Sequence, residues 1–171
     1  GNSATNGGAV FTRGDMTIIH GTLSNNTATS GPAIFNLGVL TSGNSIFDGA
    51  CTAAGLTTSL GGNLESLGTT CGIGGATSDR INVSSGELAL LPLADNGGPT
   101  LTHALSASSL AIDDAVSSNC GWPFDQRGIP RPLDGNSDGI SACDKGAFEF
   151  DSIFADGFEL GDTTAWSSAM P

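Results

Sequence analysis

The chain has 171 residues, which is enough for one domain with a packed core. Seventeen acidic residues face five dispersed basic ones, and the formal charge of −12 opposes binding to nucleic acid or to an anionic membrane surface. The 26 glycines and the frequent Ser, Thr and Asn favour short strands with tight turns over helices, while a 38% apolar content argues against disorder.

The first fifty residues contain an internal repeat. Residues 2–17 align with residues 26–41 at an offset of 24, and eight of the sixteen aligned positions are identical. A period of this length is typical of a solenoid coil. Within each copy, short apolar pieces are separated by Gly, Asn, Ser and Thr, a pattern that predicts short strands.

Stacking of the two copies predicts an all-β fold, a right-handed parallel β-helix with coils at residues 2–25 and 26–49. A leucine-rich repeat has a similar period, but its Leu/Asn signature is missing here. In the predicted stack Phe11 lies over Phe35, and we expect this pair to belong to a continuous internal ladder. A stable solenoid needs at least about three repeats. We therefore expect either further coils before the first residue or an N-terminal edge that pairs with another molecule.

Residues Arg13-Gly14-Asp15 spell a cell-adhesion tripeptide. Three residues match such a motif by accident often, and the second copy of the repeat has Leu37-Gly38-Val39 at the aligned positions. We interpret the tripeptide as a turn between two strands.

Four cysteines, at positions 51, 71, 120 and 143, fall into two sequential pairs without Cys-x-x-Cys spacing, which argues against a zinc site. We predict the disulfides Cys51–Cys71 and Cys120–Cys143, which imply an oxidising compartment. Four cysteines allow three pairings, and free buried thiols are the remaining alternative.

From Asp48 onward we expect the period to fade, and a series of motifs follows. These are LLPLADNGGPTLTHAL (90–105), AID (111–113), DQRGIPRP (125–132) and CDKGAFE (143–149). In this order they resemble the bacterial choice-of-anchor, right-handed parallel β-helix repeat family, which is similar to polymorphic outer membrane proteins. The resemblance covers residues 1–150, with Lys145 standing where the family normally has Ile.

That resemblance implies a secreted or cell-surface bacterial protein whose β-helix ends in a loop-rich cap. Residues 151–171 include IFADGFELGDTTAWS, which resembles a short tail on exported proteins of gammaproteobacteria. The alternative is an exposed peptide or a final capping strand. No apolar run reaches the roughly 18 residues of a membrane helix, so we expect no membrane span.

The segment DGNSDG, residues 134–139, matches the start of a calcium-binding loop. The predicted calcium ligands are Asp134, Asn136, Asp138, the carbonyl of Ile140 and Asp144. Asp144 would replace the usual bidentate Glu, because Lys145 occupies the twelfth position. The alternative is a surface turn rich in Asx residues, which needs no metal.

Other charged residues give weaker signals. Arg127 and Arg131 could bind an acidic sugar, but such arginines more often bind nearby carboxylates and hold loops together. His103 and Asp113 would need a positioned nucleophile to form a hydrolytic triad, and the chain has no Gly-x-Ser-x-Gly elbow.

These features favour a non-catalytic secreted or cell-surface module with a structural or adhesive role, and we expect no enzyme activity. A surface glycan or a host or neighbouring-cell partner would be bound outside the cell. Two alternatives stay open. The first is a polysaccharide lyase or hydrolase whose active site lies upstream, and the second is a subunit of an extracellular filament that assembles end to end.

Overall fold

The computed structural model describes residues 1–117 and 120–152, and these are mostly β-structure with one short helix, as predicted. The strands are β1 (Ser3–Asn6), β2 (Val10–Thr12), β3 (Asp15–Ile19), β4 (Thr22–Leu23), β5 (Thr27–Ser30), β6 (Ile34–Asn36), β7 (Val39–Gly43), β8 (Ile46–Asp48), β9 (Cys51–Ala53), β10 (Leu56–Ser59), β11 (Leu64–Ser66), β12 (Arg80–Val83), β13 (Leu90–Ala94) and β14 (Thr102–Leu105). The helix is α1 (Ser85–Leu88).

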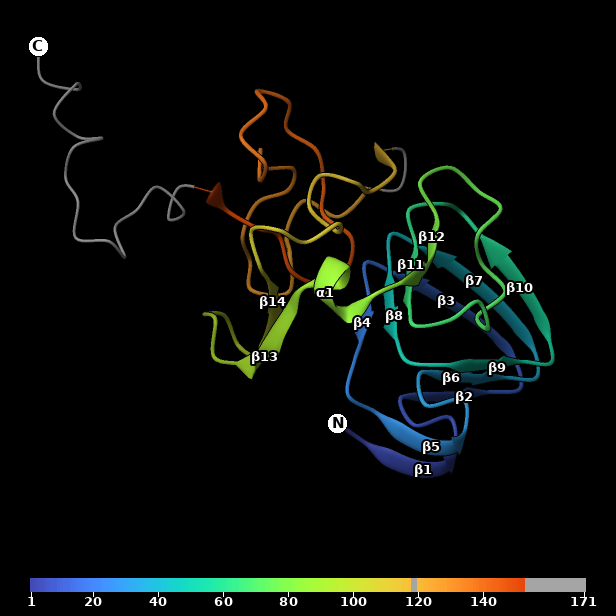
Figure 1. Cartoon of the computed structure of the whole chain (residues 1–171). Coiled ribbons are helices and arrows are strands. Elements are labelled where there is room, and N and C mark those ends of the chain that lie inside the picture. Colours follow the sequence, from blue (N-terminus) through green and yellow to red (C-terminus); the bar gives the residue numbers. More distant parts are fainter. Residues whose placement is uncertain (118–119, 153–171) are drawn as a thin grey trace, which may run out of the picture.

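Strands β1 to β12 form four parallel sheets, which make up the stacked region, residues 1–83 (Figure 1). The sheets are β1–β5, β2–β6–β9, β3–β7–β10 and β4–β8–β11–β12. Strands β1 to β4 pair with β5 to β8 at the offset of the sequence repeat, so that Val10 lies opposite Ile34 and Met16 opposite Leu40. The alignment read from the sequence repeat is confirmed.

A third layer of strands follows, where no repeat is visible in the sequence. Strand β9 pairs with β6, with Cys51 opposite Ile34, and β11 pairs with β8, with Leu64 opposite Ile46. This layer is shorter than the first two because it has no counterpart of β1 and β5; the chain passes from β8 to β9 through Gly49 and Ala50. The period of the repeat ends near Asp48, as expected, but the parallel stacking continues beyond it at a shorter spacing.

The interior of the stack is apolar, but one predicted ladder lies outside it. Ile34, Leu40 and Phe47 are fully buried there. Phe11 is 44% exposed, and its ring packs against that of Phe35 at 5.5 Å between centroids. Successive side chains of a strand point to opposite faces, so the burial of the preceding residue, Ile34, turns Phe35 outward. The prediction that the phenylalanines form an internal ladder is wrong.

The same corner of each layer carries a residue in the left-handed conformation. These corner residues are His20, Asn44 and Gly61, with φ of 51°, 48° and 93°, and they follow the ends of β3, β7 and β10. Asn and Gly tolerate this conformation better than most residues. Next to Gly61, a Cβ on Gly62 would lie 1.9 Å from the Asn44 Oδ1 atom, so only glycine fits there.

Beyond the stack the chain becomes irregular. Helix α1 begins with a capping box between Ser84 and Glu87, and β13 and β14 form an antiparallel hairpin. The C-terminal region, residues 106–152, has isolated bridges between Phe124 and Pro130 and between Leu133 and Ala142 in place of regular strands. A second apolar core joins it to the stack. That core contains Ile46, Leu64, Val83, Leu88, Ala104, Leu105, Ala111 and Phe148.

Both predicted disulfides, Cys51–Cys71 and Cys120–Cys143, are present. The first joins β9 to the loop before β12, and the second closes a loop of the C-terminal region. Disulfides fit a protein that folds outside the reducing cytoplasm. Within the described residues, no helix has the length and apolar character needed to cross a bilayer. Most of the predicted tail, from residue 153 on, lies outside the described residues.

Candidate functional site

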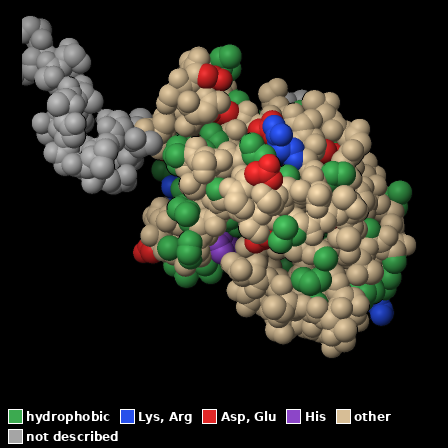
Figure 2. Space-filling model, in the orientation of Figure 1, with side chains coloured by type: hydrophobic (Ala, Val, Ile, Leu, Met, Phe, Trp, Pro, Cys, Tyr) green, Lys and Arg blue, Asp and Glu red, His purple; other side chains and the backbone are tan. Residues whose placement is uncertain are grey.

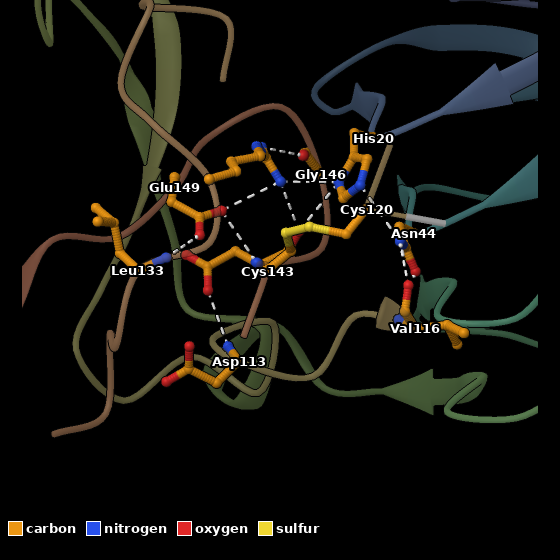
Figure 3. Close-up of a disulfide and its surroundings, with 11 residues drawn as sticks. His20, Asn44, Asp113, Val116, Cys120, Leu133, Cys143, Gly146 and Glu149 are labelled. Atoms are coloured by element: carbon orange, nitrogen blue, oxygen red, sulfur yellow. Dashed lines mark hydrogen bonds and ion pairs between the residues drawn. A yellow bond between two sulfur atoms is a disulfide. The ribbon is translucent and has the colours of Figure 1, made fainter. Parts of the chain in front are cut away.

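Arg131 is the centre of a buried ionic network in the C-terminal region. Its guanidinium lies 3.2 Å from the carboxylate of Glu149 and donates to the carbonyls of Asp144 and Gly146, both at 2.8 Å. Glu149 also accepts the backbone N–H of Leu133 at 3.0 Å (Figure 3). Because the polar groups of this set bind one another, their interactions offset part of the cost of removing the charges from water.

A second ion pair lies beside the first. The Arg127 guanidinium lies 2.8 Å from the carboxylate of Asp125, and its centre lies 3.6 Å from the centroid of the Phe148 ring. Asp125 also accepts backbone N–H groups from Ile129 and Glu149. These contacts fix the loop that carries Asp125 against the last segment of the chain.

The network reaches the corner residues of the stacked region. Arg131 Nη1 lies 2.8 Å from Nδ1 of His20, although the two residues are far apart in sequence. The amide of Asn44 bonds to the backbone of Val116 in both directions, at 2.8 and 3.1 Å (Figure 3). The left-handed corner therefore aims side chains of two successive layers at the C-terminal region.

Burial changes the protonation of this network. Burial raises the pKa of Asp144 to about 8, and the neighbouring charge of Glu149 adds to that increase. Burial also raises the pKa of Glu149, although the charge of Arg131 opposes the change. The pKa of Arg131 is lowered by burial. Perturbed carboxyls are found in active sites and in structural ion pairs alike, and here Asp144 accepts backbone N–H groups from Asp113 and Phe150.

Lys145 is fully buried. Its Nζ atom donates to the carbonyl of Ser78 and lies 2.6 Å from the carboxylate of Asp114. Asp114 also binds Arg80 of strand β12. Burial lowers the pKa of Lys145, while Asp114 opposes that change. Lys145 thus ties the C-terminal region to the last strand of the stack.

The predicted calcium ligands do not converge in one place. Asp134, Asn136 and Asp138 share one loop, where their side-chain oxygens accept N–H groups of the loop itself. Ile140 is exposed at the end of that loop, whereas Asp144 is buried and bonded elsewhere. In the described part of the chain, no group of three or more His, Cys, Asp or Glu side chains is arranged to hold a metal. The loop has the hydrogen bonds of an Asx-rich turn, and calcium binding stays a prediction.

The remaining residues that the sequence singled out each contact other groups of the protein. Arg13 and Gly14 lie between β2 and β3, where the Arg13 guanidinium stacks 5.3 Å from the Phe11 ring. His103 lies in β14 and donates from Nδ1 to the carbonyl of Leu91. Asp113 instead accepts the backbone N–H groups of residues 135 and 136.

Sequence reasoning missed a pocket at the junction of the two regions. Its volume is about 270 Å³, and its lining consists of Ile19, His20, Trp122, Phe124, Asp125, Gln126, Arg131 and Ala147. Trp122 is 66% exposed and Phe124 is 56% exposed. The signal in the sequence was Trp-Pro-Phe at 122–124, two aromatic residues in alternation after a cysteine, but nothing in the sequence placed residues 19 and 20 beside it.

The surface drawn in Figure 2 consists mainly of uncharged polar side chains and backbone, with apolar side chains in separate small groups. No family model, no curated protein and no solved structure matches this chain. A functional proposal therefore depends on the residues and contacts described above.

Proposed function

We propose that the chain is the end segment of a right-handed parallel β-helix in a secreted or cell-surface protein, with a non-catalytic role that is structural or adhesive. The observation that supports this most strongly is the parallel, in-register pairing of the two copies of the repeat in four sheets at once. Each copy contributes one strand to each sheet in the same order, as expected when a chain winds repeatedly around one axis.

The C-terminal region packs along one side of this solenoid and contacts each layer. The backbone N–H of Ala147 donates to Thr22 of the first layer, and that of Val116 donates to Asn44 of the second. Leu64 of the third layer belongs to the apolar core that contains Leu105 and Phe148. These contacts stabilise the layers from the side, and the expected cap over the end of the stack stays a prediction.

The charged groups of the C-terminal region favour a structural role over catalysis. A glycosidase needs two carboxyls that can reach the scissile bond. Asp125, Asp144 and Glu149 instead bind backbone N–H groups and arginines of their own region. A polysaccharide lyase or hydrolase with its active site upstream is the alternative.

Two assays test this proposal. Incubation of the protein with polygalacturonate and with neutral polysaccharides should produce no reducing ends and no unsaturated products. Surface biotinylation of intact cells that produce the full-length protein should label it as strongly as a known surface protein. Turnover of any polymer, or labelling only after lysis, would contradict the proposal.

End-to-end assembly is a second candidate. Strands β1, β2, β3 and β4 each lie at one edge of their sheet in the described part of the chain. Such edges can accept a further layer from the same protein or from a second molecule. A molar mass from light scattering that rises with protein concentration would support assembly between molecules, and a constant monomer mass would exclude it.

A further inference from the structure

The pocket between the corner of the stack and the C-terminal region joins two kinds of surface. Trp122 and Phe124 form an exposed aromatic wall, whereas Asp125 and Arg131, both 8% exposed, contribute buried polar atoms to its floor. Exposed aromatic side chains at a pocket mark binding sites more often than isolated surface residues do. We propose that this pocket binds one ring of a neutral glycan, stacked on Trp122.

Backbone contacts hold the loop that carries the aromatic wall. Phe124 is bridged to Pro130, and the backbone N–H of Arg131 donates to the carbonyl of Pro123 at 2.9 Å. The Asp125 carboxylate accepts N–H groups from Arg127 and Ile129 inside the same loop. Because the loop is fixed before a ligand arrives, binding loses little conformational entropy.

The charges in the pocket favour a neutral ligand. An acidic sugar would need an uncommitted cation, but the Arg131 guanidinium already binds Glu149 and two carbonyls. The acidic excess of the whole chain further repels polyanions. A purely apolar ligand would displace water from the exposed side-chain amide of Gln126 without replacing its hydrogen bonds. A sugar ring offers an apolar C–H face to the aromatic wall and hydroxyls to the polar rim, where Gln126 lies.

The backbone around the wall argues against an extended peptide. A bound peptide strand needs free N–H and C=O groups along an edge. Pro123 has no N–H, and its carbonyl is already occupied by Arg131. The volume of about 270 Å³ lies below the range of roughly 300–1,000 Å³ for drug-sized ligands. Recognition of one ring of a longer polymer fits this size.

The inference deepens the adhesive part of the proposed function and rests on it. Its experiment uses the full chain, in which Trp122 and Trp166 are the two tryptophans. A Trp166→Phe background leaves Trp122 as the sole tryptophan. Its fluorescence would be titrated with neutral oligosaccharides (cello-, xylo-, manno- and galacto-series), with oligogalacturonate and with a mixture of short peptides. We expect a saturable change with at least one neutral series and none with oligogalacturonate or peptides.

Calorimetric titration of variants locates the site. Trp122→Ala should weaken binding by at least about tenfold, as expected for an aromatic anchor, and Trp122→Phe should recover part of the loss. Phe11→Ala, which removes an exposed aromatic from the stacked region, is the matched control and should bind like the wild type. The exposure of Trp122 predicts an unchanged melting temperature for its variants.

Several results would overturn the inference. These are no response to any neutral glycan, undiminished binding by Trp122→Ala, or preferred binding of oligogalacturonate or peptides. Such a failure is distinguishable from failure of the proposed function, because the latter is decided by surface labelling and by polymer turnover, and neither depends on this pocket.

Discussion

The stacked region and the C-terminal region hold short, Gly-rich segments together by different means. In the stacked region, parallel backbone ladders repeat from layer to layer, and apolar side chains such as Ile34 and Leu40 fill the interior. In the C-terminal region, isolated bridges replace ladders, and buried charges bind loops to one another. In the stacked region, the stabilising free energy is distributed over many equivalent contacts. In the C-terminal region, it is concentrated in a few residues.

This difference predicts where single substitutions cause the most damage. Removing one side chain from a stack of equivalent layers leaves the neighbouring backbone bonds in place. Removing Arg131 leaves Glu149 buried without its counter-ion and frees the carbonyls of residues 144 and 146. Substitutions that perturb the two regions separately test this difference.

The largest effect is expected for Arg131→Met, which keeps the volume but removes the charge. Breaking a buried ion pair by removing one partner costs about 3–5 kcal/mol. Urea denaturation should show a loss of this order in the free energy of unfolding. Arg13→Met in the exposed turn of the stack is the control, and it should change stability by less than about 0.5 kcal/mol. Equal losses for both variants would contradict the comparison.

The disulfide Cys51–Cys71 should contribute the next largest amount. It closes a short loop between β9 and the segment before β12, and such a bond stabilises by about 2–4 kcal/mol. Replacing both cysteines with alanine, or adding a reductant, should lower the melting temperature of the wild type. An unchanged midpoint after complete reduction, checked by thiol titration, would refute this contribution.

Gly62→Ala tests the contact between the two regions. Gly62 has a φ of 71°, and a Cβ there would collide with the Asn44 amide that binds Val116. We expect a destabilisation of about 2 kcal/mol. Gly75→Ala is a matched control, because a Cβ at Gly75 meets no atom within 4 Å. If both substitutions lower the melting temperature equally, the corner contact does not contribute to stability.

The change in stability for one unit of pH is the smallest of the predicted effects. Asp144 has a pKa of about 8 in the folded protein, against about 3.9 for an unfolded Asp. Between these values the folded state holds a proton that the unfolded chain releases. The free energy of unfolding should therefore fall as the pH rises from about 4 to 8, by at most about 1.4 kcal/mol per pH unit from this group.

Melting curves between pH 5 and 8 test this slope, with Asp144→Asn as the comparison. The variant has no titrating group at this position and should show a flatter profile than the wild type. A wild-type protein that becomes more stable as the pH rises to 8 would show that Asp144 is ionised in the fold.

The sequence predicted those parts of the molecule that depend on periodicity. The alignment of Val10 with Ile34 followed from identity between two copies, and both disulfides followed from cysteine order. The outward position of Phe11 was missed, because the repeat predicts the register of neighbouring copies while the alternation of side chains decides the face. The third layer was missed because its strands follow at a shorter spacing than the repeat and no residue identity marks them.

The candidate site could be predicted much less well. The contact between His20 and Arg131 joins opposite ends of the chain, and no motif spacing encodes such a separation. The expected structural role of Arg127 and Arg131 agrees with their contacts, but the sequence did not identify their partners. The pocket beside Trp122 forms where two segments that are distant in sequence meet. The sequence alone therefore could not predict it.

The parallel stacking, with its shortened third layer, is the central claim, and cross-linking of cysteine pairs tests it directly. Thr17 lies opposite Thr41, and Thr41 lies opposite Thr58. Neighbouring strands are about 4.8 Å apart, within the reach of a disulfide, while residues two strands apart exceed the limit of about 7 Å. Under mild oxidation, Thr17→Cys/Thr41→Cys and Thr41→Cys/Thr58→Cys should form disulfides within one molecule, and Thr17→Cys/Thr58→Cys should not. Peptide mass spectra with the opposite pattern would contradict the stacking.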